Sequence, residues 1–218
     1  MPPGPILERL DPVQWKQLRE QYPQGPGNPK INRFANAAKL IKESIERAQD
    51  LWLDKSPPLR ILDLGGGPNY FLFVCRALGH EGFGVDIDEQ PLFRDTSELL
   101  GVPRVIHRIE ARTPLPHLGG KFDLITAHRV CFYKKERNEA GRWHEWDSDD
   151  WKFFLGDVRD RMLKPNGRLL LDFNPRPGER RFMTPEVRQV LLDKGARIFR
   201  SKALLSANPA VAPKFRVR

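Results

Sequence analysis

Residues 60–71, which read RILDLGGGPNYF, decide the fold of this chain. The apolar run Leu59–Leu64 predicts a short buried strand, and the glycine cluster Gly65–Gly67 follows it directly. Tyr70–Leu78 then predicts a helix, which Gly79 ends. Glycines between a strand and a helix let the backbone approach a ligand closely, because they carry no Cβ. The stretch therefore predicts the first strand, a ligand loop and the first helix of an open α/β sheet.

Strands and helices alternate through the rest of the chain. We expect strands at 82–87, 104–111, 122–127 and 168–173, helices at 90–100, 148–163 and 184–194, and a final antiparallel pair at 196–205 and 214–218. Such alternation implies parallel strands joined by right-handed crossovers. The sequence thus predicts an α/β fold with a doubly wound, mostly parallel sheet.

Residues 1–58 have a different pattern and predict a helical extension. Asp11-Pro12 opens a short helix to about Gln21, and Asn28-Pro29 opens a second helix to about Leu53. In the second helix the apolar residues recur every three or four positions: Ile31, Phe34, Ala38, Ile41, Ile45, Ala48 and Trp52. We expect this extension to cap the site of a main domain at 59–218.

The composition is that of an ordinary globular chain. Of 218 residues, 39% are hydrophobic and 30% charged, and no apolar run reaches the roughly 20 residues of a membrane helix. The start of the sequence shows no secretory pattern, and the two cysteines, Cys75 and Cys131, predict reduced thiols in or near the core. We therefore expect a cytoplasmic protein with no membrane partner. His144 and Asp147 have a metal-like spacing that nothing completes, so no metal site is predicted.

The whole chain has a formal net charge of +9. Its basic residues concentrate toward the C-terminal end. Arg and Lys residues between 176 and 218 greatly outnumber the acidic ones, which are Glu179, Glu186 and Asp193. Such an end is either a solvated basic surface or a surface that meets nucleic acid.

Two classes of cofactor use a glycine loop of this kind. A dinucleotide requires Gly-x-Gly-x-x-Gly, and Gly65 and Gly67 satisfy its first two positions. The third position is Tyr70, whose bulk obstructs the close packing of helix on strand that this glycine permits. The dinucleotide interpretation is therefore weak.

The segment Asp63–Asn69 resembles the first motif, roughly Asp-x-Gly-x-Gly-x-Gly, of the class I S-adenosylmethionine-dependent methyltransferases. Asn69 stands where the last glycine of the motif usually occurs. Asparagine tolerates a left-handed backbone better than most residues, so the turn can persist. The resemblance implies a seven-stranded sheet with an antiparallel last strand and S-adenosylmethionine as the cofactor.

Later segments extend the resemblance to about Phe173. Asp86 lies 21 residues beyond Gly65, where the family places a carboxylate that accepts hydrogen bonds from both ribose hydroxyls. Residues 108–111 resemble the end of the third strand, which implies that Glu110 binds the adenine amino group and that the Ala111 N–H meets a ring nitrogen. Residues 122–127 resemble the fourth strand, and 163–169 resemble the turn before the fifth. The cofactor residues that we predict are Asp63, Gly65, Gly66, Gly67, Asn69, Asp86, Ile87, Glu110, Ala111 and His128.

The methyl acceptor is expected beyond the fourth strand, where residues 127–133 read AHRVCFY. His128 is the first candidate for a general base or an orienting donor, because imidazole titrates near neutral pH; a cofactor contact or a structural role is the alternative. Tyr133 is the second catalytic candidate. The polar loop 134–150 suggests a lid or an acceptor contact, and a surface loop anchored by its tryptophans is the alternative. The substrate contacts that we predict are Arg129, Trp143, His144 and Tyr22.

Three functions remain open from the sequence. The first is a methyltransferase that acts on an unidentified small molecule. The second is an RNA methyltransferase that uses the basic C-terminal part, and tight, salt-sensitive RNA binding would favour it. The third is a non-catalytic partner subunit that binds the cofactor without turnover. The fold alone does not identify the acceptor.

Overall fold

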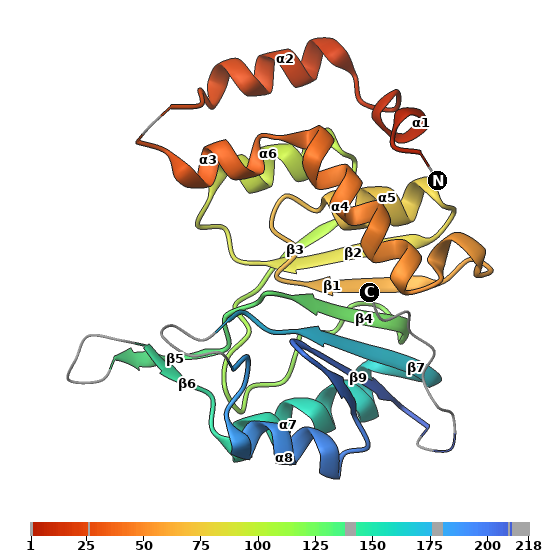
Figure 1. Cartoon of the computed structure of the whole chain (residues 1–218), viewed down its shortest axis with the longest axis vertical. Coiled ribbons are helices and arrows are strands. Elements are labelled where there is room, and N and C mark those ends of the chain that lie inside the picture. The colour runs from red at the N-terminus through yellow and green to blue at the C-terminus, as the bar shows by residue number, and fades with distance from the viewer. Residues whose placement is uncertain (1, 26, 138–142, 176–180, 209, 211–218) are drawn as a thin grey trace. The chain divides into compact units, whose positions relative to one another are not determined.

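A computed structural model describes residues 2–25, 27–137, 143–175, 181–208 and 210. Its main strands are β1 (Arg60–Leu64), β2 (Glu81–Asp86), β3 (Arg104–Ile106), β4 (Phe122–His128), β7 (Leu163–Asp172), β8 (Arg197–Phe199) and β9 (Lys202–Ser206). They form a seven-stranded sheet in the order β3-β2-β1-β4-β7-β9-β8 (Figure 1). β1, β2 and β3 pair in parallel, β4 and β7 pair in parallel, and β9 is antiparallel to both β7 and β8. This topology confirms the predicted α/β fold with its antiparallel last strand.

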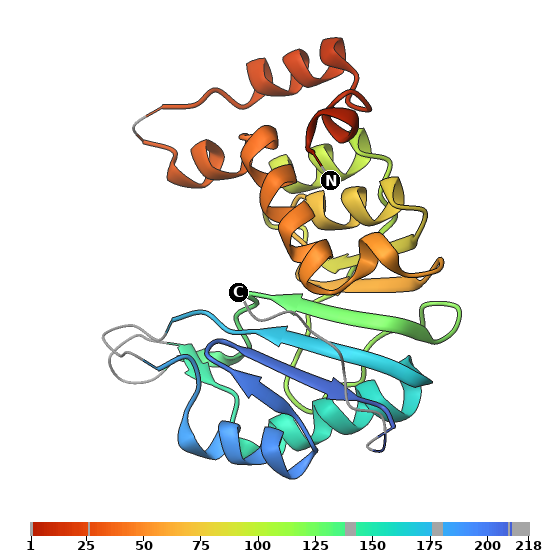
Figure 2. The ribbon, with the colours of Figure 1, turned by 45° about the vertical axis from the view of Figure 1, so that its right-hand side comes forward.

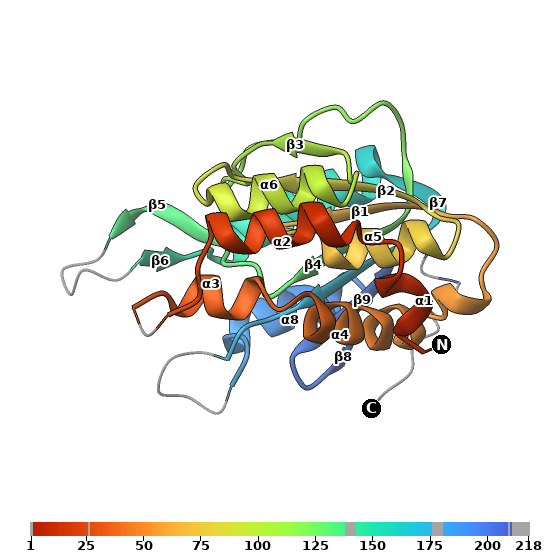
Figure 3. The same cartoon turned by 90° about the horizontal axis from the view of Figure 1, so that it is seen from above.

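The described chain divides into two compact units, one ending at Ile106 and the other beginning at His107. The boundary predicted after residue 58 lies inside the first unit, which joins the N-terminal helices to β1, β2 and β3. Its helices are α1 (Gly4–Leu7), α2 (Pro12–Gln21), α3 (Pro29–Phe34), α4 (Ala37–Asp50), α5 (Tyr70–Ala77) and α6 (Pro91–Leu99), with a 3₁₀ turn at Leu53–Lys55. α4 packs against α5, and α2 packs against α6 (Figure 3).

The single helix predicted from Asn28-Pro29 to Leu53 is wrong, because the chain breaks between α3 and α4. Asn36 begins a new helix there, and its side chain accepts a hydrogen bond from the Lys39 N–H at 3.1 Å. The break rotates the buried face, so that Ala37 is buried and Ala38 is exposed. Trp52 also lies outside the helix, exposed and with a left-handed backbone (φ 60°).

The strands of the first unit bury the apolar residues that predicted them. Ile61, Leu62 and Leu64 of β1 are fully buried, and Leu72 and Val74 of α5 pack with no exposure. β3 is shorter than the predicted strand at 104–111, since it ends at Ile106 and the chain continues without regular structure. Glu110 and Ala111 therefore lie in a loop.

The second unit places two helices on one face of β7, β9 and β8 (Figure 2). These helices, α7 (Ser148–Asp157) and α8 (Pro185–Asp193), pack against each other, and a π-helical turn at Val158–Met162 extends α7. Phe122, Leu124 and Ile125 of β4 are fully buried. A register shift between β4 and β7 accommodates the predicted turn at 164–167, after which the two strands end together with His128 opposite Asp172.

Two predictions for the second unit need correction. The final antiparallel pair is the hairpin β8–β9, and the strand predicted at 214–218 lies outside the described residues. The polar segment 134–150 includes strand β6 (Trp143–Glu145) and all but the first residue of β5 (Tyr133–Arg137), and the two strands pair antiparallel in a separate two-stranded sheet. None of the described helices is long and apolar enough to cross a membrane.

Candidate functional site

The glycine loop after β1 is a tight turn with three left-handed positions. Gly65, Gly67 and Asn69 have φ values of 65°, 56° and 60°. The Gly65 N–H donates to the Val85 carbonyl at 2.7 Å, which holds the start of the loop against β2. Glycine removes the steric cost of such a backbone, and asparagine tolerates it, as the sequence predicted for Asn69.

Asn69 is fully buried and fills the space beneath the loop. Its Nδ2 donates to Ser97 Oγ on α6 at 2.9 Å. A Cβ on Gly66 would lie 2.2 Å from Asn69 Oδ1, and a Cβ on Gly84 would lie 2.7 Å from the same atom. The asparagine therefore requires glycine at both positions, on the loop and on the neighbouring strand.

Asp86 lies against this loop from the end of β2. Its Oδ2 accepts a hydrogen bond from the Gly67 N–H at 2.5 Å, and its Oδ1 accepts one from the Ile87 N–H at 2.7 Å. Burial raises the pKa of Asp86 above its usual value, while these two N–H groups and the charge of Arg104 oppose the rise. The loop and the carboxylate that the sequence assigned to one cofactor are thus adjacent in the first unit.

Asp63 forms a buried ion pair that the sequence analysis missed. Arg47 Nη2 of α4 lies 2.7 Å from Asp63 Oδ1, and the side chains are only 16% and 2% exposed. The guanidinium carbon also lies 3.8 Å from the centre of the Phe71 ring. This arrangement joins the N-terminal extension to the end of β1 by charge and to the start of α5 by a cation–π contact.

Tyr22, predicted as a substrate contact, is held by α6. Its hydroxyl donates to Asp95 Oδ2 at 2.6 Å. Burial and the neighbouring Asp95 carboxylate raise the pKa of Tyr22 to about 12. In the first unit this tyrosine therefore fixes the end of α2 on α6.

In the second unit, the predicted adenine contacts Glu110 and Ala111 are half-buried. The next residue, Arg112, has φ 55° and its Nε lies 2.9 Å from Asp150 Oδ1. Asp150 is buried at the start of α7, where it completes a capping box with Asp147. The loop that carries Glu110 and Ala111 is thus anchored to α7.

His128, the last residue of β4, is oriented by Asp172 at the end of β7. Its Nδ1 lies 2.8 Å from Asp172 Oδ2, and Ser201 Oγ donates to Asp172 Oδ1 at 2.6 Å. Burial alone would raise the pKa of Asp172, but the hydrogen bonds from His128 and Ser201 outweigh it and lower that pKa. Such a carboxylate holds a proton on Nδ1 and leaves Nε2 as the basic nitrogen.

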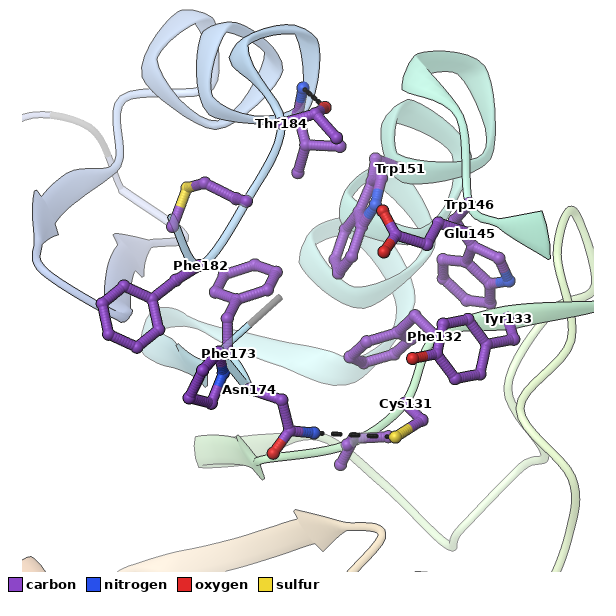
Figure 4. Close-up of a pocket in the computed structure, with 14 residues that line it drawn as sticks. Cys131, Phe132, Tyr133, Glu145, Trp146, Trp151, Phe173, Asn174, Phe182 and Thr184 are labelled. Atoms are coloured by element: carbon purple, nitrogen blue, oxygen red, sulfur yellow. Dashed lines mark hydrogen bonds between the residues drawn. The ribbon is translucent and has the colours of Figure 1, made fainter. Parts of the chain in front are cut away.

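A pocket opens beyond these strand ends, with about 520 Å³ of space including solvent. Figure 4 shows Phe173 and Phe182 on one side, and Phe132, Tyr133 and Trp151 on the other. The remaining labelled residues that line it are Cys131, Glu145, Trp146, Asn174 and Thr184. The pocket is thus apolar and aromatic, with a few polar groups, as small-molecule sites are.

The rings of this pocket pack tightly on one another. The Phe132 ring centre lies 4.8 Å from those of both Trp146 and Trp151, and the Trp151 and Phe173 ring centres are 5.5 Å apart. Lys134 of β5 adds a polar anchor, since its Nζ lies 2.6 Å from Asp147 Oδ2. These contacts fix the wall formed by α7 and the β5–β6 hairpin.

Comparison with known proteins gives matches at the level of structure. No family model and no curated protein sequence matches the chain. The PH0226 protein of Pyrococcus horikoshii OT3 is 18% identical with a TM-score of 0.51, over 86% of this chain and 96% of that one. The TehB-like SAM-dependent methyltransferase of Corynebacterium glutamicum is 16% identical with a TM-score of 0.51, over 90% and 97%. The magnesium protoporphyrin IX methyltransferase of Synechocystis PCC 6803, solved with bound SAH, is 17% identical with a TM-score of 0.50, over 89% and 92%.

The chain has the fold of the class I S-adenosylmethionine-dependent methyltransferases. Within its first unit, this methyltransferase fold gathers the cofactor residues predicted there: Asp63, Gly65, Gly66, Gly67, Asn69, Asp86 and Ile87. The residues predicted to contact the acceptor are more scattered in the second unit. Tyr133 lines the pocket, whereas Trp143 and His144 are exposed and are absent from its lining.

Several features of this methyltransferase fold were not foreseen. Arg129 is exposed with φ 54°, and its N–H donates to the Asp172 carbonyl at 2.7 Å. Cys131 is an exposed thiol at the pocket rather than a core residue, while Cys75 is buried as predicted. Among the described residues, no cluster of three or more His, Cys, Asp or Glu side chains could hold a metal ion. The residues that sequence reasoning missed are Arg47, Asp172 and the aromatic lining.

Proposed function

We propose that this protein is an S-adenosylmethionine-dependent methyltransferase that acts on a small-molecule acceptor. The observation that carries the proposal is the contact between Asp86 and the glycine loop, where a half-buried carboxylate accepts a hydrogen bond from the Gly67 N–H at 2.5 Å. A left-handed turn beside a carboxylate on the next strand suits a nucleoside whose ribose bears two hydroxyl groups. The predicted cytoplasmic setting belongs to the same proposal.

The residues of the first unit fit such a cofactor. Both oxygens of Asp86 accept backbone N–H groups, and each keeps a lone pair for a ribose hydroxyl. The left-handed loop brings backbone close to the ligand without side chains. From the family resemblance, Glu110 would bind the adenine amino group and the Ala111 N–H a ring nitrogen. When bound, the cofactor supplies a methyl group on a positively charged sulfur atom.

In the second unit we assign His128 to the acceptor. With Nδ1 held by Asp172, its Nε2 can accept a proton from the acceptor's nucleophilic group. Tyr133 adds a hydroxyl at the pocket. Alignment and this proton transfer are the contributions that the protein makes to methyl transfer.

Calorimetric titration with S-adenosylhomocysteine tests the proposal. Asp86→Asn preserves the shape but removes the charge, and loss of a hydrogen bond to a charged group costs about 1.5–3 kcal/mol, so affinity should fall about tenfold to a hundredfold. Asp88→Asn is the matched control, since Asp88 instead pairs with Arg94 and Arg104 at 3.1 and 3.0 Å. Equal effects of the two substitutions, or no binding by the wild type, would overturn the assignment.

A screen of acceptors with labelled methyl groups then tests turnover. His128→Ala should lower the rate while leaving affinity for S-adenosylhomocysteine nearly intact; an unchanged rate would remove His128 from the mechanism. Tight, salt-sensitive binding of RNA would favour an RNA methyltransferase instead. Cofactor binding without turnover on any acceptor would indicate a partner subunit.

A further inference from the structure

The aromatic pocket begins where β4 and β7 end. His128 and Asp172, the last residues of these strands, are directly opposite each other in the parallel ladder. Cys131 and Asn174 follow within three residues and line the pocket. Asn174 Nδ2 also donates to the Arg129 carbonyl at 2.8 Å, which ties the two strand exits together. The oriented histidine therefore lies two residues before Val130, where the lining begins, and is not itself part of that lining.

The lining favours a flat apolar ligand. Phe132, Trp151, Phe173 and Phe182 present rings from four separate segments of the chain (Figure 4). Met183 adds a flexible thioether to the lining. Aromatic faces and edges attract another ring beyond the effect of buried area alone. These properties indicate a ligand with a flat aromatic ring.

We propose that this pocket binds the aromatic ring of the methyl acceptor, and that the acceptor is an aromatic alcohol or amine that loses its proton to His128. This inference rests on the proposed function. The acceptor oxygen or nitrogen forms the new bond to the methyl carbon, and the carbon–sulfur bond breaks with both electrons remaining on sulfur. The acceptor's proton passes to Nε2 of His128, while Asp172 retains the hydrogen bond at Nδ1.

Cys131 offers a direct reporter of ligand in this pocket. The chain has two cysteines, and Cys131 is exposed while Cys75 is fully buried. Burial raises the pKa of the Cys75 thiol well above its ordinary value, so Cys75 reacts slowly with alkylating reagents. The rate of alkylation by iodoacetamide, followed by mass spectrometry, therefore measures access to the pocket.

The probes are 2-naphthol and its saturated counterpart decahydro-2-naphthol, which share the hydroxyl but differ in flatness and in π-electrons. At nine-tenths occupancy, 2-naphthol should slow alkylation of Cys131 about tenfold, and the saturated alcohol should protect much less. Equal protection by the two alcohols would overturn the preference for an aromatic ring. Choline serves as a third probe, an organic cation without a ring. Protection of Cys131 by choline but by neither alcohol would indicate a site for organic cations and would also overturn the preference for an aromatic ring.

Two variants test whether 2-naphthol protects Cys131 by binding in this pocket. Phe182→Leu removes a ring from the pocket and should reduce protection by 2-naphthol several-fold. Phe153→Leu is the matched control, because Phe153 is 38% exposed on α7 and is absent from the lining. Equal protection in the wild type and in Phe182→Leu would place the probe elsewhere.

Measurements of turnover test the role of His128 as the base separately from binding of the ring in the pocket. With 2-naphthol or 2-naphthylamine as acceptor, His128→Gln should lose methyl transfer but keep protection of Cys131. If S-adenosylhomocysteine binds and neither probe protects Cys131, this inference fails and the proposed function stands. If 2-naphthol protects Cys131 and no S-adenosylhomocysteine binds, the proposed function fails, and with it the assignment of the ligand as a methyl acceptor.

Discussion

Alanine at position 66 tests the packing of the cofactor loop. Gly66 lies outside the left-handed region, so its backbone accepts alanine without strain. The added Cβ would nevertheless lie 2.2 Å from Asn69 Oδ1 and 3.3 Å from Asp63 Oδ2, and real Cβ contacts essentially never fall below 3.0 Å. The Asn69 side chain must therefore move, although it is fully buried and hydrogen-bonded to Ser97 at 2.9 Å.

The expected cost follows from these two contacts. Overpacking of a buried site costs about 1–3 kcal/mol, and loss of a neutral hydrogen bond about 1 kcal/mol. We therefore expect Gly66→Ala to lower the free energy of unfolding in urea by about 2–4 kcal/mol. Affinity for S-adenosylhomocysteine should fall as well, because displacement of the turn moves the Gly67 N–H away from Asp86.

A double-mutant cycle tests whether the clash with Asn69 is what destabilises Gly66→Ala. Asn69→Gly removes the obstructing side chain, so Gly66→Ala should cost at least about 1 kcal/mol less in that background. Gly156→Ala is the matched control: Gly156 lies in α7 with nothing within 4 Å of the added Cβ, and alanine should stabilise the helix by about 0.5–1 kcal/mol. Additive effects of Gly66→Ala and Asn69→Gly would refute the reasoning.

Three further predictions concern the polar anchors of the fold. Native hydrogen bonds lower the pKa of Asp172, so its stabilising effect is present above about pH 4 and is lost as the pH falls. Asp172→Asn should flatten the decline in unfolding free energy between about pH 5 and pH 2, and an equally steep decline would contradict this. Tyr22→Phe should cost about 1 kcal/mol in thermal unfolding, because it removes the 2.6 Å hydrogen bond to Asp95; an unchanged Tm would show that α2 is held by other contacts. Arg47→Met should cost about 3–5 kcal/mol in urea unfolding, because it removes the ion pair of buried Asp63, and a loss below 1 kcal/mol would show a solvated carboxylate.

Local signals predicted the fold well where they act within a few residues. Asp11 begins α2 and accepts the Val13 and Gln14 N–H groups, and Thr184 begins α8 and accepts the Val187 N–H. Each cap satisfies its N–H groups with a nearby side chain, so the sequence contains the whole interaction. The largely buried strand β4 was also predictable, because its apolar run needs no partner to be recognised.

Features that depend on distant partners were not predictable. The break at Asn36 was hidden because the helical periodicity continues across it. It is revealed only by the hydrogen bond from the Lys39 N–H to the Asn36 side chain, which caps the new helix. Asp63 was predicted as a cofactor residue, and nothing in the sequence indicated its ion pair with Arg47, 16 residues earlier. The partner of His128 was likewise hidden, since the register of β4 and β7 places Asp172 opposite it.

Asn69 shows how a departure from a family motif becomes consistent in three dimensions. The resemblance called for glycine at this position, and the backbone indeed adopts φ 60°, which glycine favours. The side chain that asparagine adds occupies space that Cβ atoms at Gly66 and Gly84 would fill, and it bonds to Ser97. A strained position is thus supported by two glycines and one serine from three different elements. Residues 66, 69, 84 and 97 therefore pack as one unit. Glycine at position 69 would leave empty the space beside Gly66 and Gly84 that the asparagine side chain fills, and would remove the hydrogen-bond donor to Ser97.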